Sequence, residues 1–429
     1  MLESVKVLGV DIDNLDSDEI LGKMESFIRD KRVQQIVTVN TEFLVASQKD
    51  QRFRAILSKS SINTADSVGV LWAAKFLSLP LITYPILDFL QALWQTLYTG
   101  LSIVFYPSYI RSVLKEKNSG SELIWKIAEK AAQNGFKIFL LGGYGDTPKI
   151  VEDRLREKFA SLQVVGANSW DPDKEGIIEK IKARKPDILM VAYGSIKQEK
   201  WIEQNQQNLG IPVAIGLGGT FDYMAGKRPS PPQILRDIGL EWAFRLVTQP
   251  YRLKRIITAV PVFIWLTIQY KLQIQKPYRE NVAAAVIRDD GKILICKRIS
   301  GYKGYSFEGE HWQIPQGGIE KNETLEQALA RELEEEVGIT EFKNLGEIYN
   351  AHSYDWPIKL ARESYYGKYR GQRQNLVFIR VPDSVQLRLD QKEFGDYKWV
   401  DVSDLRNLVH PVRHRLADEI YDNFEKFVK

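Results

Sequence analysis

Three glutamates at helical spacing, Glu332, Glu335 and Glu336, form the group of side chains best suited to chemistry. At positions i, i+3 and i+4 of a helix their carboxylates share one face, where like charges repel by a few tenths of a kcal/mol per pair. A solvated acidic face is the ordinary explanation of such a run. Two glycines precede this helix and Arg331 adjoins the cluster, which favours a binding role. Oxygen ligands on a rigid element suit Mg²⁺ or Mn²⁺.

A single aspartate is the leading candidate for acid–base chemistry in the first two-thirds of the chain. All four histidines lie at or beyond position 311, so chemistry before that point must use carboxylates or another group. Asp66 lies in a turn of small residues, "NTADSVGV", where an Asx turn is the ordinary role. Because no imidazole is available there, we expect Asp66 to act as a general base. Thr38 and Asn40, in "VTVN", are polar residues at the end of an apolar run.

Alternating apolar and amphipathic runs must position these residues. Short apolar runs that end in turn residues lie at 34–40, 136–143, 162–167, 186–194 and 211–219. Amphipathic runs such as 121–135 and 147–160 lie between them. This alternation predicts a parallel sheet covered by helices on both faces. Ligands of such folds gather at the carboxyl ends of the strands.

Length and composition limit the architecture. A chain of 429 residues, 44% hydrophobic and 27% charged, is expected to fold into two or three domains. The single cysteine, Cys296, excludes an internal disulfide and suits a reducing cytoplasm. Residues 1–14 lack the apolar run of a secretory signal peptide. We expect a first domain at 1–255, a connecting segment at 256–276 and a second, α+β domain at 277–429.

One apolar stretch interrupts the first domain. Between Leu81 and Ile110 the one formal charge is Asp88, and aromatic residues are dense. A single membrane crossing needs roughly 20 apolar residues and would put strands of one sheet on opposite sides of the bilayer. We therefore expect an insertion at 81–117 that forms a re-entrant or interfacial hairpin. A buried helical pair or a homo-oligomer contact is the alternative.

A basic segment follows the last expected strand of the first domain. Between Lys227 and Arg255 seven basic residues face two acidic ones, and the apolar run after them is interrupted by Pro261. Basic charge beside an apolar segment predicts docking on an anionic membrane surface, at about 1 kcal/mol per cation. We expect an amphipathic docking helix at 256–276, and a plain linker helix is the alternative.

The glutamate cluster belongs to a longer pattern. It resembles the Nudix box, G-x(5)-E-x(7)-R-E-U-x-E-E-x-G-U, at Gly317, Glu323, Arg331, Glu332, Leu333, Glu335, Glu336, Gly338 and Ile339. The segments "YRENV", "HWQIPQGG", "YDWP", "GQRQ" and "EFGDYKWV" are similar to the dinucleoside polyphosphate hydrolase and RNA pyrophosphohydrolase branch. The resemblance implies an α/β/α sandwich that hydrolyses a nucleoside diphosphate derivative with Mg²⁺ or Mn²⁺.

The Nudix resemblance also implies roles for single residues. Glu332, Glu335, Glu336 and Glu393 would hold the metal ions, and Glu335 and Glu336 would take part in catalysis. Arg279 and Arg298 would face the phosphates of the nucleotide substrate. Bound metal lowers the pKa of water and polarises a phosphoryl oxygen.

Residues 7–255, apart from the apolar insertion, resemble the WecG/TagA/CpsF glycosyltransferases. The motifs are "VTVNTEFLVASQ", "ADSVGV", "GSELI", "FLLGG", "VAYGSIKQEKWI", "GLGGTFDYMAGK" and "GLEWAFRLVTQPYRLKR". The resemblance implies a Rossmann-like domain that transfers an N-acetylmannosamine-type sugar from a UDP-sugar to polyprenyl-diphosphate-linked GlcNAc, with inversion and without a metal. Asp66 would be the base, and Thr38 and Asn40 would contact the sugars. The UDP side would be lined by Gly142, Gly143, Gln198, Glu199, Gly218, Gly219 and Asp222.

In this family the segment after "GLEW" is a membrane-docking appendage that meets the lipid diphosphate. Arg245, Arg252 and Arg255 match its arginines, and their charge would suit a diphosphate. We expect a peripheral or monotopic protein on the cytoplasmic face of the plasma membrane, with no DNA partner.

The leading hypothesis is therefore a bifunctional enzyme of cell-surface polysaccharide biosynthesis, a glycosyltransferase fused to a Nudix hydrolase. Two alternatives remain at this point. The first domain could be a UDP-sugar- or lipid-binding anchor beside a working Nudix enzyme, or both sites could be relics on a scaffold.

Overall fold

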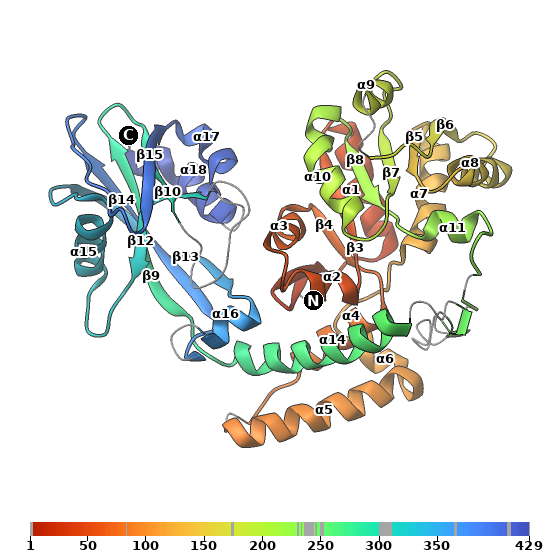
Figure 1. Ribbon diagram of the computed structural model, residues 1–429, viewed down its shortest axis with the longest axis horizontal. Coiled ribbons are helices and arrows are strands. Elements are labelled where there is room, and N and C mark those ends of the chain that lie inside the picture. Colours follow the sequence, from red (N-terminus) through yellow and green to blue (C-terminus); the bar gives the residue numbers. More distant parts are fainter. Residues whose placement is uncertain are drawn as a thin grey trace. The chain divides into compact units, whose positions relative to one another are not determined.

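Two compact units make up the chain in the computed structural model, Met1–Leu272 and Gln273–Lys429 (Figure 1). The structure describes residues 3–82, 84–172, 176–229, 231–232, 234–235, 244, 247–248, 253–299, 311–363, 367–409 and 413–428. Of residues 85 and 253–259 it describes the backbone alone.

A six-stranded parallel sheet forms the centre of the first unit. The strands of this unit are β1 (Ser4–Val7), β2 (Val10–Asp13), β3 (Gln34–Val39), β4 (Ile62–Ala65), β5 (Lys137–Gly142), β6 (Gln163–Asn168), β7 (Ile188–Ala192) and β8 (Val213–Gly216). The sheet order is β4-β3-β8-β7-β5-β6, and β1 and β2 form a separate antiparallel pair. The central strands are almost wholly apolar because side chains on both faces are buried.

Helices cover both faces of this sheet. The helices of this unit are α1 (Ser17–Arg29), α2 (Thr41–Ala46), α3 (Gln51–Lys59), α4 (Val68–Ser78), α5 (Pro85–Phe105), α6 (Pro107–Ile110), α7 (Gly120–Asn134), α8 (Thr147–Lys158), α9 (Ile177–Lys182), α10 (Lys197–Leu209), α11 (Thr220–Met224) and α14 (Leu253–Ile274), of which α5, α6 and α14, as far as the structure describes them, pack on α4 and not on the sheet. Ile138 and Leu140 of β5 join a core with α1, α7 and α8, whereas the alternate residues Phe139 and Leu141 join a second core with α9 and α10. The predicted parallel sheet with helices on both faces is confirmed.

The apolar insertion forms one long helix and one short helix. Helix α5 has 21 residues and α6 has four, so the expected hairpin is wrong in form. A buried helical pair is wrong as well, because most large apolar side chains of α5 are exposed. Among the described residues, no helix has the length and the apolar character that a membrane crossing requires.

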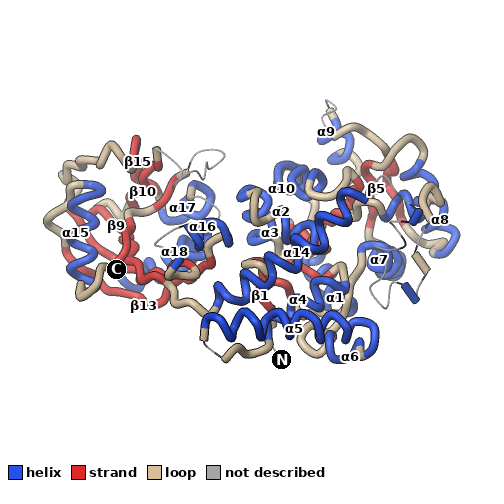
Figure 2. Tube along the Cα trace, turned by 60° about the horizontal axis from the view of Figure 1, so that its bottom comes forward, coloured by secondary structure: helices blue, strands red, loops and turns tan. Residues whose placement is uncertain are grey.

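Helix α14 packs against α4. Its Phe263 ring lies 6.1 Å from the Trp72 ring of α4, measured between centroids. The buried Lys271 donates from Nζ to the Phe76 carbonyl at the end of α4, and burial lowers the pKa of Lys271 to about 7. Figures 1 and 2 both show α4 beside α5 and α14. Much of the segment 256–276, expected as a connection, is thus packed into the first unit.

A mixed seven-stranded sheet forms the second unit. Its elements are β9 (Arg279–Arg288), β10 (Ile293–Arg298), β11 (Trp312–Gln313), β12 (Gln316–Gly318), α15 (Leu325–Val337), β13 (Lys343–Asp355), α16 (Ile358–Glu363), β14 (Gly371–Val381), β15 (Phe394–Val400), α17 (Val402–Leu408) and α18 (His414–Val428). The order is β11-β10-β9-β14-β13, with β12 beside β9 and β15 beside β10. Helix α15 covers one face, and α17 and α18 cover the other.

Candidate active sites

The carboxyl ends of β3 and β4 meet the start of α7 at Asp66. The backbone N–H of Asp66, which directly follows β4, donates to the Val39 carbonyl of β3 at 2.8 Å. Its Oδ1 accepts the N–H of Gly120, the first residue of α7, at 3.1 Å. The partial positive charge at this end of a 15-residue helix favours a carboxylate there. Asp66 is therefore held in a fixed orientation at the sheet edge while remaining partly exposed.

Gly120 also brings Thr38 close to Asp66. A side-chain carbon on Gly120 would lie 3.4 Å from both Leu217 and Thr220, and 3.9 Å from Thr38 Oγ1. Residues of β3, of the loop after β8 and of the start of α11 thus surround Gly120, the residue whose N–H binds the aspartate. This junction holds an acidic group, two hydroxyls and a helix terminus within one small region.

A second polar cluster lies at the ends of β7 and β8. Gln198 Oε1 accepts the N–H of Gly218 at 2.9 Å, and Gln198 Nε2 donates to Glu199 Oε1 at 2.7 Å. The other Glu199 oxygen accepts the N–H of Ile196 at 2.9 Å. A side-chain carbon on Gly216 would collide with both Gln198 and Glu199. Burial raises the pKa of Glu199 to about 7 despite these hydrogen bonds.

The turn that leads into α10 is strained. Ile196 has φ +70° and ψ −47°, and the N–H of Lys197 donates to the Ser195 carbonyl across it at 2.9 Å. These features define a γ-turn. A β-branched residue at this φ costs on the order of 1–3 kcal/mol, and such strain is concentrated at functional sites. Here it aims the Ile196 N–H at the buried Glu199 carboxyl.

Two glycines bring the end of β5 against the end of β7. Gly142 and Gly143 have φ of +97° and +78°. A side-chain carbon on Gly142 would lie 2.8 Å from the Ala192 carbonyl, and the N–H of Gly143 donates to that carbonyl at 2.9 Å. Asp222, in α11, forms an ion pair with Arg228 at 3.2 Å. These groups lie at or after the carboxyl ends of strands in the same sheet as the Gln198 cluster.

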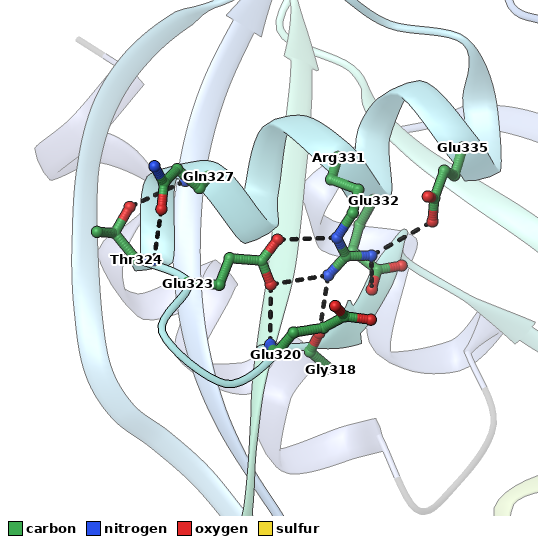
Figure 3. A network of polar contacts seen from close by, with 8 residues as sticks. All are labelled: Gly318, Glu320, Glu323, Thr324, Gln327, Arg331, Glu332 and Glu335. Carbon is green, nitrogen blue, oxygen red and sulfur yellow. Dashed lines mark hydrogen bonds and ion pairs between the residues drawn. The ribbon is translucent and has the colours of Figure 1, made fainter.

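In the second unit, helix α15 carries the acidic cluster. At its start, Thr324 Oγ1 accepts the N–H of Gln327 at 3.2 Å, and the Thr324 N–H donates to Gln327 Oε1 at 2.9 Å (Figure 3). At its end, Gly338 adopts φ +74°. This capping box and left-handed glycine define both ends of the helix. The acidic residues near its C-terminus therefore project from a rigid element.

Arg331 connects the carboxylates that the sequence placed side by side. Its Nε and Nη2 reach the two oxygens of Glu323 at 2.8 and 2.9 Å. Its Nη1 reaches Glu332 at 2.8 Å and Glu335 at 3.3 Å (Figure 3). Nη2 also donates to the Gly318 carbonyl at 3.0 Å. One guanidinium thus reduces the repulsion among three glutamates and lowers the pKa of Glu323.

Glu336 and Glu332 are the least exposed acidic groups of α15. Glu336 accepts the N–H of Gln316 at 2.8 Å. Its pKa lies well above the ordinary value, chiefly through burial and further through the charges of Glu332 and Glu393. Burial also raises the pKa of Glu332, against the opposing effect of Arg331. Cationic charge added here would stabilise both carboxylates.

In the structure the carboxylates of Glu332, Glu335 and Glu336 accept hydrogen bonds from other groups of the protein. Within the described ranges, no group of three or more His, Cys, Asp or Glu residues is arranged as a metal site. Glu393 lies nearer the surface, with its carboxylate 3.6 Å from Arg298. The donor chemistry nevertheless fits a hard divalent cation, because the group contains only oxygen ligands and two of them have raised pKa values.

Comparison with known proteins assigns both units. Residues 5–109 and 86–277 match the model of the "Glycosyl transferase WecG/TagA/CpsF family". The chain belongs to this glycosyltransferase family. Residues 277–424 match the "NUDIX domain" model, so a Nudix hydrolase domain follows the glycosyltransferase domain and the chain combines both enzyme classes.

The chain is also similar to individual proteins. The N-acetylglucosaminyldiphosphoundecaprenol N-acetyl-beta-D-mannosaminyltransferase of Staphylococcus aureus (strain NCTC 8325 / PS 47) is 24% identical over 275 residues, which cover 63% of this chain and 95% of that protein. Among solved structures, the MutT protein of Methanosarcina mazei Go1 shows 20% identity and a TM-score of 0.27 over 35% of this chain and 98% of its own. A C. elegans Ap4A hydrolase shows 16% identity and a TM-score of 0.26 over 35% of this chain and 99% of its own.

In the WecG/TagA/CpsF domain, the expected residues fall into neighbouring groups at one sheet edge. Thr38 lies in the Asp66 junction, and Asn40 starts α2, where its Oδ1 caps the Phe43 N–H at 3.0 Å. Gly219 precedes α11 directly. The predicted Arg245 and Arg252 lie outside the described residues, as does the side chain of Arg255.

Sequence reasoning missed several residues of these sites. Gly120 and Thr220 lie in recognised motifs, "GSELI" and "GLGGT", but nothing in the sequence indicates that Gly120 donates to Asp66 or that Thr220 lies beside Gly120. In the Nudix domain, a side-chain carbon on Gly317 would collide with Glu332, and one on Gly318 would collide with Arg279. The two glycines before the helix were the available signal for this close approach.

Proposed function

We propose that the glycosyltransferase domain transfers an N-acetylmannosamine-type sugar from UDP to polyprenyl-diphosphate-linked GlcNAc. The activity for which the Staphylococcus aureus relative is named supports this substrate pair. The observation that carries the proposal is the Asp66 junction, where Gly120 holds an oriented carboxylate and also lies next to Thr38, in a region without histidine.

In the proposed reaction Asp66 takes the proton of the acceptor hydroxyl. The hydroxyl oxygen then forms a bond to the anomeric carbon, and the bond from that carbon to UDP breaks, with inversion. Thr38 and Asn40 orient the sugars. The glycine turns at Gly142–Gly143 and Gly218–Gly219, together with Gln198, Glu199 and Asp222, bind the UDP side, and this step uses no metal.

We propose further that the Nudix domain hydrolyses a nucleoside diphosphate derivative, of the dinucleoside polyphosphate kind. Glu332, Glu335, Glu336 and Glu393 would hold Mg²⁺ or Mn²⁺, which when bound lowers the pKa of water and neutralises phosphate charge. Arg331 orients Glu332 and Glu335 through its hydrogen bonds. Arg279 and Arg298 bind the substrate phosphates, and Glu335 and Glu336 take part in catalysis.

The proposed site of action is the cytoplasmic face of the plasma membrane, with the protein attached peripherally. The relative's acceptor is linked to undecaprenol, so the transferred sugar must be delivered at a lipid surface. The seven basic residues between Lys227 and Arg255 supply charge for an anionic surface and for the acceptor diphosphate.

Two substitutions test the two activities in one chain. Asp66→Asn should reduce sugar transfer from UDP to a short polyprenyl-diphospho-GlcNAc by at least about 100-fold, while Mg²⁺-dependent release of nucleotide products stays unchanged. Glu335→Gln should have the reverse effect, and unchanged calorimetric unfolding of the substituted unit is the folding control for each variant. Undiminished transfer by Asp66→Asn would refute Asp66 as the base, and absence of transfer by the unmodified chain would leave the first domain as a binding anchor.

A further inference from the structure

Helix α5 has its polar residues turned inward and its apolar residues turned outward. Asp88, Ala92, Gln95 and Thr99 recur at spacings of four, three and four residues, and all four are buried. They therefore lie on one face of the helix, which packs against the first unit. A helix that faces water has the opposite arrangement.

Specific contacts fix the inward face. The Trp72 Nε1–H of α4 donates to Thr99 Oγ1 at 2.9 Å. Gln95 Nε2 donates to the Pro80 carbonyl at 2.9 Å. The Tyr98 hydroxyl lies 3.3 Å from that of Tyr109, which belongs to α6. The orientation of α5 is thus determined by hydrogen bonds, and rotating the helix to bury its apolar side would break them.

The outward face is wide and contains no charged side chain. Its large apolar residues, with their neighbours at the ends of the helix, are Ile82, Tyr84, Ile86, Leu87, Phe89, Leu90, Leu93, Trp94, Leu97, Leu101, Val104, Phe105 and Tyr106. Trp94 is 63% exposed and Phe105 is 81% exposed. At 100° per residue, the members within α5 cover an arc of roughly 160°.

The chemistry of this face favours a lipid surface over a protein partner. The α5 helix of a second copy would cover only a narrow strip of this 160° arc. Protein–protein interfaces, in addition, are surrounded by a rim of polar residues. Here the one charge between Leu81 and Ile110, Asp88, is buried on the opposite side. Tyr84 and Tyr106 stand at the two ends of the helix, as aromatic side chains do at the membrane–water boundary. The next charged residue, Arg111, is exposed and complements anionic headgroups.

We propose that α5 lies in the plane of an anionic phospholipid bilayer, with the Leu93–Leu97–Leu101 side immersed in the acyl boundary and the Thr99 side held by α4. This surface shares no residue with the basic segment at 227–255 or with the Asp66 junction. It places the first unit on the membrane through α5. The two segments that match the family model, 5–109 and 86–277, overlap along this helix. The proposal does not depend on which sugar is transferred.

The chain offers a clean label for the test. Its one cysteine, Cys296, is buried, so a thiol-directed environment-sensitive fluorophore reacts with an introduced cysteine. Leu97→Cys reports on the outward face, and Tyr349→Cys, at an exposed apolar position of the second unit, is the matched control. With vesicles of phosphatidylcholine and about one-third phosphatidylglycerol, the label at 97 should shift to the blue and be quenched by lipids brominated in the acyl chain. The label at 349 should do neither.

A second measurement removes the apolar surface. Leu97→Gln/Leu101→Gln should weaken co-sedimentation of the full chain with these vesicles by about 30-fold or more, whereas Tyr349→Gln/Tyr421→Gln should leave it unchanged. Calorimetric unfolding of the first unit verifies folding in the α5 variant, and turnover of a water-soluble dinucleoside polyphosphate by the Nudix domain verifies it in the Tyr349→Gln/Tyr421→Gln variant. Unchanged vesicle binding by the α5 variant would overturn the proposal. So would a shift at position 97 caused by adding unlabelled protein without vesicles, because the face would then bind a second copy.

Discussion

Replacement of Glu199 by glutamine should change the stability of the first unit in opposite directions at low and high pH. The carboxyl is buried, and its pKa rises from an ordinary 4.5 to about 7 in the folded chain. Between these values the unfolded chain has released the proton that the folded chain retains. The free energy of unfolding therefore falls as pH rises from about 4.5 to about 7 and stays level above that range.

The magnitude follows from the size of this shift. At 1.36 kcal/mol per pKa unit, the wild-type chain loses roughly 3 kcal/mol across the range. Glutamine has no such titration, but it can accept only one of the two hydrogen bonds that Ile196 and Gln198 donate, at a cost of about 1 kcal/mol. The variant should therefore be less stable than wild type by about 1 kcal/mol near pH 4, where the carboxyl is protonated in both states, and more stable by about 2 kcal/mol near pH 8.

Calorimetry of the full chain at the two pH values measures this reversal. For a domain of this size, 2 kcal/mol corresponds to roughly 4–8 °C in melting temperature. Glu203→Gln, on the same helix, is the control, because its carboxylate is partly exposed and pairs with Lys59 at 3.4 Å. A surface pair of this kind contributes little, so the control should show no reversal. If Glu199→Gln shifted the melting temperature by the same amount and in the same direction at both pH values, the inference that this carboxyl is buried and protonated would be refuted.

Three further outcomes follow from contacts in the two units. Gly317→Ala should displace the Glu332 carboxyl and lower Mg²⁺-dependent Nudix turnover by about 10–100-fold without changing sugar transfer, as parallel assays would show. Arg331→Lys loses the planar fork that binds several carboxylates and should lower the free energy of unfolding of the second unit by about 2 kcal/mol, measured by calorimetry. Trp72→Phe removes the bond to Thr99, so limited proteolysis within α5 should become about fivefold faster.

The helices, the strands and the Nudix box could be predicted from the amino-acid sequence more fully than the packing of the side chains. Apolar runs ending in turn residues correctly placed β3, β5, β6, β7 and β8, because a strand buried on both faces must be apolar throughout. The hairpin expected at 81–117 failed for a physical reason. The polar residues of α5 look like dilution of a membrane segment, but they satisfy Trp72, Pro80 and neighbouring backbone groups, and sequence alone does not reveal those partners.

The contacts that sequence reasoning missed at Gly120, Gly216 and Gly317 share one physical property: each glycine allows a carboxylate to approach the backbone closely. Gly120 offers its N–H to Asp66, Gly216 leaves room for Glu199, and Gly317 leaves room for Glu332. In sequence each glycine indicates only a turn or a helix start, because its acidic partner lies at least 15 positions away along the chain. The acidic residues can be recognised by type and spacing, whereas the glycines that orient them can be recognised only once strands and helices have been brought together. Substitutions at these glycines should therefore impair function before they impair folding, since the space they leave belongs to the site and not to the core.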